Sequence, residues 1–503
     1  MMRRKSLGRY SACSVALVVF AIVVLGGSTS LLQGQESGET PLSKVERKNK
    51  APLSREVLRV KLPKPFETKL KNGLTVLILE DHRTPSVFVQ LHLGGAGALF
   101  EPPGMTGLAN ATAQMLREGT RLRTSVQIAE AIDRLGATVG AGGSFGSSQV
   151  VLNASGLSDN FDSWFALVID VLLNPSFPQE ELEKLKQRQR AQLRQQRSAT
   201  NFLVHERFNR AVYGDHPAAV VSPTMESLDA LTPEALIRWH RERYAPQNAL
   251  LAIAGDVHIQ ELLPQLEKWF DGWQQNAIKE TWPPNPEAAT SRKVYLVHRP
   301  NSVQTSVSLG NIAINRRSPD YIPMVVMNHI LGGGSSGRLF LNLREEKGYT
   351  YGVYSNFSAR RYPGPWHAGG NMRTEVTGGA LVEFFNEIGR IRDETVPAAE
   401  LEDSKRALAA RFALSLEQPA TILGLAVSRV RYRLPDDYWD TYADKIMAVT
   451  AEDVQRVARR YLDPDAMQVV AVGDALTIQS VLERYGPVEV YDSSGKLTSL
   501  PKP

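Results

Sequence analysis

Histidine is the commonest metal ligand and acid–base group in proteins, and this 503-residue chain contains nine histidines. No two of them stand three or four residues apart, so the sequence has no local zinc-binding pair on a helix. The only cysteine, Cys13, lies in an N-terminal apolar run, and no Gly-x-Ser-x-Gly segment joins an expected strand to an expected helix. Neither a local metal motif nor a thiol or serine nucleophile is therefore expected. The histidines are His82, His92, His205, His216, His240, His258, His298, His329 and His367.

One segment nevertheless has the frame of a zinc-peptidase helix. Residues 107–120 resemble the inverted H-x-x-E-H motif, in which two histidines four residues apart bind zinc and the intervening glutamate activates a water. Asn110 and Gln114 stand at the two ligand positions, and Ala113 stands at the base position. An amide is a poor zinc ligand and a methyl group cannot accept a proton. We expect the helix to be retained without its metal chemistry.

The chain resembles the pitrilysin family of metallopeptidases, which includes insulin-degrading enzymes and mitochondrial processing peptidases. The resemblance extends from Leu62 to about Asp474, and residues 70–76 are similar to the family's first strand. The family completes its zinc site with a glutamate on a later helix. Counting on from Gln114 leads to Arg190 and Ala191, in a stretch without an acidic residue. The resemblance thus implies no metal or cofactor on this chain, and zinc on a partner chain.

An arginine and a tyrosine seven residues apart, Arg344 and Tyr351, occur in the second half of the chain. They are similar to a family pair that reaches across to the zinc site, and in some bacterial members the zinc helix and this pair lie on different chains. A guanidinium and a phenol can donate hydrogen bonds to a scissile carbonyl and to the oxyanion that forms from it. In the alternative interpretation, Arg344 pairs with Glu345 or Glu346 on a solvated face, and Tyr351 is a strand residue in the core.

Gly332, Gly333 and Gly334 precede this motif. No Gly-Lys-Ser/Thr follows them and no strand ends just before them, so they do not form a phosphate-binding loop. Similarity to the glycine-rich loop of the processing peptidase's non-catalytic subunit implies a mobile segment that contacts substrate or partner. The alternative is a flexible turn between helices.

An internal repeat indicates the elements that position these residues. Thr232 and Thr450 each open an expected helix that leads to an apolar strand ending in Gly-Asp, and in both copies Thr and Gly are 23 residues apart. Strands and helices intermixed without strict alternation predict an α+β fold. The family resemblance implies two homologous domains in a clamshell arrangement around a peptide chamber, each a mainly antiparallel sheet with helices on one face. The expected parts are an N-terminal domain (62–280) with the degenerate zinc helix, a linker (281–292) and a C-terminal domain (293–495) with the Arg/Tyr motif; long helices are expected at 125–135, 178–197 and 398–415.

The N-terminus carries Arg3, Arg4 and Lys5, followed by the apolar run 12–27 and small residues, which is the layout of a secretory signal peptide. Residues 1–35 are therefore expected to be a signal peptide or, if uncleaved, an N-terminal membrane anchor, and residues 36–61 a flexible tether. We expect secretion across the inner membrane and a periplasmic location, free or anchored. The net charge of +5 is spread along the chain without a basic block among aromatics, so no nucleic-acid partner is expected.

The first hypothesis is a zinc-free subunit of a heteromeric zinc endopeptidase, inactive alone, that supplies a peptide chamber and the Arg344/Tyr351 pair to a zinc-bearing homologue. The second is a non-catalytic peptide-binding or scaffold protein of the same fold. The third is an independent enzyme with an unrecognised metal site. A neighbouring gene for a similar chain with an intact H-x-x-E-H would favour the first hypothesis.

Overall fold

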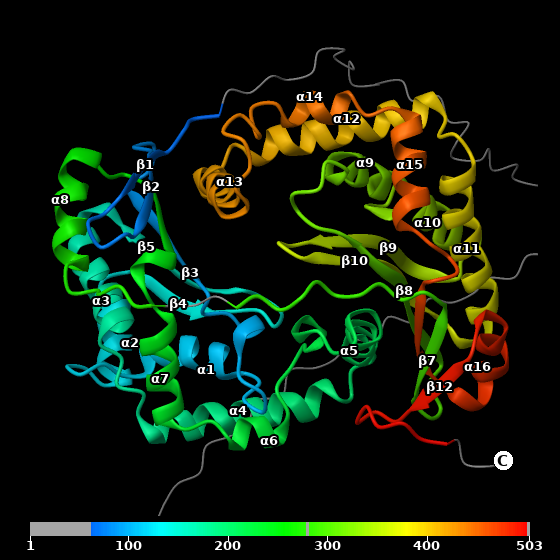
Figure 1. Ribbon diagram of the computed structural model, residues 1–503, viewed down its shortest axis with the longest axis horizontal. Coiled ribbons are helices and arrows are strands. Elements are labelled where there is room, and N and C mark those ends of the chain that lie inside the picture. The colour runs from blue at the N-terminus through cyan, green and yellow to red at the C-terminus, as the bar shows by residue number, and fades with distance from the viewer. Residues whose placement is uncertain (1–61, 278–280, 500–503) are drawn as a thin grey trace, which may run out of the picture. The chain divides into compact units, whose positions relative to one another are not determined.

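The computed structural model describes residues 62–277 and 281–499, so the expected signal peptide or anchor (1–35) and tether (36–61) lie outside the described residues. All described residues belong to one compact unit. Within them, no helix is both long and apolar enough to span a bilayer. The chain forms two six-stranded sheets with packed helices, a mixed α+β fold (Figure 1). Residues 62–277 are called the first half, and residues 281–499 the second half.

The first sheet has two parallel strands beside each other, and its other pairs are antiparallel. Its strand next to the centre, residues 249–255, is buried at every position, because apolar residues cover both faces of the sheet there. In order across the sheet, the strands are β1 (Phe66–Lys69), β2 (Thr75–Glu80), β6 (Ala249–Gly255), β3 (Ser86–Gly94), β5 (Gln149–Leu157) and β4 (Thr138–Gly142).

The second sheet repeats this order from its second strand onward, and only the outer strand next to the parallel pair is different. That outer strand runs parallel to its neighbour, whereas β1 runs antiparallel to β2. The strands in order are β12 (Val488–Tyr491), β7 (Lys293–His298), β11 (Gln468–Gly473), β8 (Gln304–Ile314), β10 (Pro363–Arg373) and β9 (Thr350–Ala359). The helices of the first half are α1 (Leu108–Met115), α2 (Ser125–Arg134), α3 (Phe161–Leu173), α4 (Gln179–Gln196), α5 (Thr200–Tyr213), α6 (Met225–Asp229), α7 (Pro233–Arg243) and α8 (Ile259–Phe270). Those of the second half are α9 (Tyr321–Gly332), α10 (Arg338–Phe340), α11 (Thr377–Asp393), α12 (Ala398–Ser415), α13 (Pro419–Tyr432), α14 (Tyr442–Met447), α15 (Ala451–Tyr461) and α16 (Ala475–Leu482).

The sequence repeat corresponds to the same pair of elements in each sheet. Thr232 caps α7 by accepting a hydrogen bond from the Ala235 amide (3.2 Å), and Thr450 caps α15 by accepting one from the Asp453 amide (3.2 Å). These helices lead to β6 and β11, which occupy equivalent places in the two sheets. The helices expected at 125–135, 178–197 and 398–415 are confirmed as α2, α4 and α12. Residues 281–292 contain neither helix nor strand.

Each sheet is covered on one face by helices of its own half and on the other by a helix of the opposite half. Helix α13 packs on β2 and β6 of the first sheet, where Leu423 and Val427 meet Leu77 and Ala252. In return, α5 packs on β8 and β11 of the second sheet. Figure 1 shows α13 beside the first sheet and α5 beside the second. The apolar surface buried in these contacts stabilises the association of the two halves.

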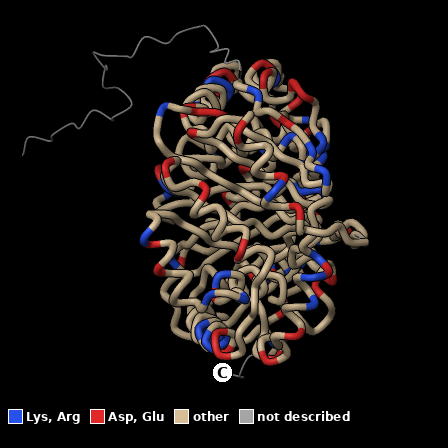
Figure 2. Tube along the Cα trace, turned by 90° about the vertical axis from the view of Figure 1, so that its left-hand side faces the viewer, with Lys and Arg blue, Asp and Glu red and all other residues tan. Residues whose placement is uncertain are grey.

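The charged residues are mixed over the surface rather than collected by sign. In Figure 2, lysine and arginine positions are interspersed with aspartate and glutamate positions on the side shown. Such a distribution gives no extended field of one sign on the side shown.

Candidate functional site

The zinc-helix positions lie on α1, which packs against β4 and β5. Asn110 and Gln114 are half-buried, and Ala113 is completely buried. The Asn110 carboxamide oxygen accepts a hydrogen bond from the backbone amide of Gly143 (3.3 Å), just beyond β4. Its side chain therefore holds the loop after β4 rather than offering an atom to a metal.

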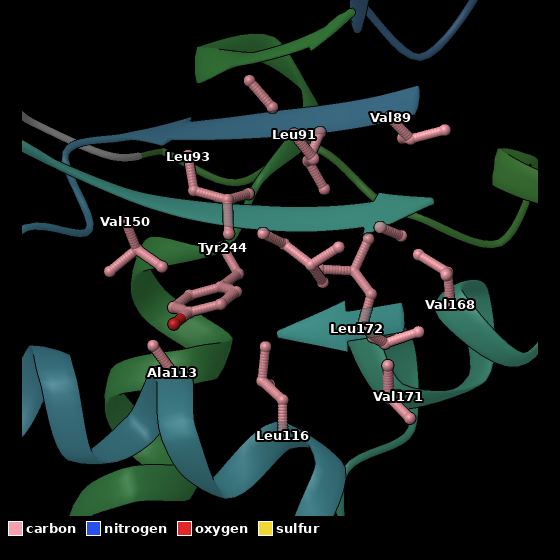
Figure 3. Packing of buried hydrophobic residues seen from close by; sticks show 14 of the residues in the cluster. Val89, Leu91, Leu93, Ala113, Leu116, Val150, Val168, Val171, Leu172 and Tyr244 are labelled. Atoms are coloured by element: carbon pink, nitrogen blue, oxygen red, sulfur yellow. The ribbon is translucent and has the colours of Figure 1, made fainter. Parts of the chain in front are cut away.

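The base position faces the hydrophobic core. Figure 3 shows the Ala113 methyl group directed toward the ring of Tyr244, with Leu116 and Val150 nearby. Ala113 and Val150 are 0% exposed. Because no solvent reaches this methyl group and it has no lone pair, the position cannot activate a water.

A cavity of about 230 Å³ lies beside Gln114 and is where a third zinc ligand would be needed. Its charged lining consists of Arg117, Glu118 and Arg188. The two guanidinium groups outnumber the single carboxylate, so the net charge of the lining repels a divalent cation, and no histidine is among the described residues of the wall. The residues present therefore do not fit zinc.

Arg190 and Ala191, to which counting on from Gln114 leads, do not line the cavity beside Gln114. Arg190 forms an ion pair with Asp229 of α6, and Ala191 is exposed. The α4 residues that line the cavity beside Gln114 are Leu185 and Arg188, which are three apart on one helical face.

A residue that the sequence did not indicate fixes the start of α1. The Glu101 carboxylate accepts hydrogen bonds from the backbone amides of Gly107 (3.0 Å) and Ala109 (2.8 Å). Gly107, the N-cap, has a φ of 98°, which favours glycine. Burial raises the pKa of Glu101 to about 7, although the two amides oppose the shift.

The raised pKa of Glu101 predicts a pH-dependent stability. The folded state holds this proton more tightly than the unfolded state, whose pKa is near 4.5, so stability falls as pH rises from about 4.5 to about 7. The shift corresponds to about 3 kcal/mol at most. Urea unfolding of wild type and Glu101→Gln at a series of pH values should show this fall in the wild type only. The prediction is contradicted if the difference in free energy of unfolding between the wild type and Glu101→Gln does not change with pH.

Tyr351 and Arg344 have different surroundings. Tyr351 is the second residue of β9 and is 91% exposed, so the alternative that it is a core residue is wrong. The Arg344 side chain is 45% exposed and lies in the π-helical turn Leu341–Glu346. Its Nε is 3.6 Å from Glu345 Oε1 and its guanidinium lies 4.7 Å from the Phe340 ring centroid. The alternative pairing of Arg344 with Glu345 is therefore observed.

Tyr351 lines a cavity of about 920 Å³ between the two halves. The first half contributes the loop 144–146 and α5, and the second half contributes β8, β9 and β10. Arg360 is the only charged residue among the described residues of its wall, and no carboxylate lines it. Burial lowers the pKa of His367 to about 4, so this wall residue is neutral at pH 7. The cavity thus offers mainly neutral hydrogen-bonding groups.

Strand β9 is the edge of the second sheet, since β10 is its one pairing partner among the described strands. Its residues Thr350, Tyr351, Gly352, Tyr354 and Asn356 all lie in the cavity wall. An unpaired strand edge presents backbone donors and acceptors that an extended peptide can satisfy.

Gly332 is the last residue of α9, and Gly333 and Gly334 begin the turn that leads to α10. A Cβ atom on Gly332 would lie 2.7 Å from Ser355 Oγ, and one on Gly333 would lie 2.9 Å from the His329 Cα. At Gly334, no atom lies within 4 Å of such a Cβ. Close packing at the end of α9 and the start of the turn therefore requires glycine at Gly332 and Gly333. None of the three lines the cavity that Tyr351 lines.

Comparison with known proteins agrees with this architecture. Residues 75–221 match the insulinase family (peptidase family M16), and residues 230–408 match the peptidase M16 inactive domain. The chain belongs to the insulinase-like M16 peptidase family, as the sequence resemblance predicted. Its solved relatives include the peptidase M16 inactive domain from Pseudomonas fluorescens, with 26% identity and a TM-score of 0.76, covering 82% of this chain and 98% of that one.

Two curated relatives have contrasting names. The uncharacterized zinc protease YmxG of Bacillus subtilis is 25% identical over 399 residues, which are 78% of this chain and 95% of the relative. The non-peptidase homolog YmxG of Helicobacter pylori is 24% identical over 383 residues, which are 75% of this chain and 87% of the relative. The family therefore contains relatives named for either role.

Proposed function

We propose that this chain is the zinc-free subunit of a heteromeric M16-type zinc endopeptidase. A homologue with an intact zinc helix would bring the metal, and this chain would bring the cavity and the Arg344/Tyr351 pair. The observation that carries the proposal is the exposure of the Tyr351 phenol on a cavity wall, in a chain whose zinc-helix positions are Asn110, Ala113 and Gln114.

The cavity supports a peptide as the substrate. Backbone amides of an unfolded peptide need hydrogen-bonding partners, and the free edge of β9 can supply them by strand addition. Apart from Arg360, the described wall residues are uncharged, so most of the wall discriminates little between acidic and basic side chains. A volume of about 920 Å³ lies at the upper end of ligand-site volumes, which suits a short segment of chain.

Arg344 requires a rearrangement in this proposal. Its guanidinium now lies over Phe340 and near Glu345, yet it is almost half exposed and its contacts are surface contacts of small energy. Breaking the 3.6 Å ion pair with Glu345 costs Arg344 little free energy. A negatively charged transition state can therefore attract the guanidinium. The proposed location is the periplasm, based on the N-terminal signal-peptide layout, with the segment 1–35 cleaved or retained as a membrane anchor.

The test is purification of the chain alone, of a zinc-bearing homologue alone, and of the two together. Metal content and hydrolysis of an unstructured peptide are measured for each sample. We expect hydrolysis only in the mixture, with zinc on the homologue. Peptide turnover by this chain alone would overturn the proposal.

The second candidate is a peptide-binding or scaffold protein without a part in catalysis. It is favoured by the observed pairing of Arg344 with Glu345 and by the similarity to the Helicobacter pylori protein named a non-peptidase homolog. In that case the mixture would bind peptide without cleaving it faster than the homologue alone does.

A further inference from the structure

A second group of potential metal ligands lies at the edge of the first sheet, on different elements from α1. Strands β2 and β6 are parallel neighbours, with Glu80 in register with Gly255. Parallel strands end at the same edge of a sheet, so the residues that follow them meet. After β2 the chain continues to His82, and after β6 it continues through Asp256 to His258.

The side chains of Glu80, His82 and His258 converge there. One ligand atom from each lies within 4.8 Å of the other two, and the imidazole ring centroids are 4.8 Å apart. In a tetrahedral zinc site, bonds of about 2.0–2.1 Å place ligand atoms roughly 3.3 Å apart. All three residues are exposed, so rotation of their side chains can close the remaining gap.

Asp256 orients one of the two histidines. Its Oδ1 lies 2.7 Å from His82 Nδ1, and its Oδ2 accepts a hydrogen bond from the Ser158 hydroxyl (2.7 Å). A carboxylate on one imidazole nitrogen leaves the other nitrogen as the ligand, as in many zinc sites. Because the Ser158 hydroxyl donates to the Asp256 carboxylate and not to His82, this group is not a serine–histidine nucleophile.

The surroundings favour a cation. A neighbouring cavity of about 270 Å³ is lined by His258 together with Asp159, Asp162, Asp256 and Glu261. The positive charge of the nearby Arg83 is balanced by Asp81, whose carboxylate accepts two hydrogen bonds from the guanidinium (2.9 and 2.7 Å). One Glu80 oxygen, Oε1, accepts from the Ile259 amide at the start of α8 (2.7 Å), which leaves Oε2 as the ligand atom.

We propose that Glu80, His82 and His258 bind one divalent transition-metal ion, with zinc as the reference ion. Two imidazoles and a carboxylate form a three-ligand set, and water completes the coordination. The ion would join the end of β2 to the start of α8 and stabilise this edge of the first sheet. This site is independent of the proposed peptidase function, whose zinc stands on another chain.

The test uses the full chain after treatment with a chelator. Zinc is titrated by calorimetry, and thermal unfolding is followed with and without zinc, since an ion bound only to the folded state raises Tm. We expect one bound zinc per chain, and a loss of affinity of at least about tenfold in His82→Ala and in His258→Ala. Without zinc, these exposed substitutions should leave Tm nearly unchanged.

Matched variants locate the ion. His205→Ala removes another exposed histidine, and Gln114→Ala alters the degenerate zinc helix; both should bind zinc as the wild type does. The proposal is overturned if the double variant His82→Ala/His258→Ala keeps wild-type affinity, if the wild type binds no zinc, or if Gln114→Ala abolishes binding. The last outcome would also remove the basis of the proposed function, whereas the first two would leave it intact.

Discussion

Substituting Tyr351 by Phe in the mixed complex is expected to lower kcat about 100- to 1,000-fold while KM changes little. The change removes one hydroxyl group from a side chain that is 91% exposed on the cavity wall, so it alters neither the core nor the shape of the wall. Loss of a donor that acts on the oxyanion weakens binding of the transition state more than binding of the substrate. Steady-state hydrolysis of an unstructured peptide measures both constants.

The matched control is Tyr349→Phe, in the same segment. Tyr349 packs partly buried against the second core and does not line the cavity, so its substitution should leave kcat within about threefold of the wild type. Arg344→Ala should lower kcat in the same way as Tyr351→Phe, with the free energy of unfolding unchanged within about 0.5 kcal/mol because the side chain is a surface one. Unchanged hydrolysis in both Arg344→Ala and Tyr351→Phe would favour the scaffold hypothesis.

The sequence predicted those parts of the fold that depend on local patterns. The caps Thr232 and Thr450 are chemical signals within one turn of the helices that they begin. The repeat with its 23-residue spacing indicated equivalent elements, and β6 and β11 occupy equivalent places. The degenerate helix was recognised because its positions are close together in sequence.

The parts that sequence reasoning missed all depend on contacts between distant segments. Helix α5 packs on the second sheet and α13 on the first. No local sequence pattern predicts these partners, because an apolar helix face can be buried against any apolar surface. Glu101 precedes α1 by several residues in an irregular loop, so its capping role depends on the fold of that loop.

His82 and His258 illustrate the same limit with a signal that could have been used. The segments Glu80-Asp81-His82 and Asp256-Val257-His258 each follow an apolar strand and each combine an acid and a histidine. The strands β2 and β6 are parallel neighbours, so a prediction of this pairing from the sequence would have placed the two segments at the same edge of the sheet. A search for histidines three or four apart detects only sites on a single helix.

The largest stability effect is expected at Arg338, which opens the segment that carries Arg344. Its side chain is 8% exposed, and its Nε and Nη2 donate to the two Glu400 oxygens at 2.8 Å each. This bidentate pair joins α10 to the first turn of α12. The Glu400 side chain is 33% exposed, so solvent compensates part of its charge when Arg338 is removed, and the cost is about 2–3 kcal/mol. Arg338→Ala should therefore lower the free energy of unfolding by that amount in urea titrations.

Two further variants separate this structural role from the role proposed for Arg344. Arg338→Met/Glu400→Met removes both charges together and should recover much of the stability that Arg338→Ala loses, because desolvation of the ions offsets their attraction. Arg344→Ala, six residues along, should leave stability unchanged while it lowers hydrolysis by the complex. If Arg338→Ala costs no more than Arg344→Ala, the pair with Glu400 does not stabilise the fold, and the position of β9 and Tyr351 must depend on the apolar packing of Leu339 and Leu343 instead.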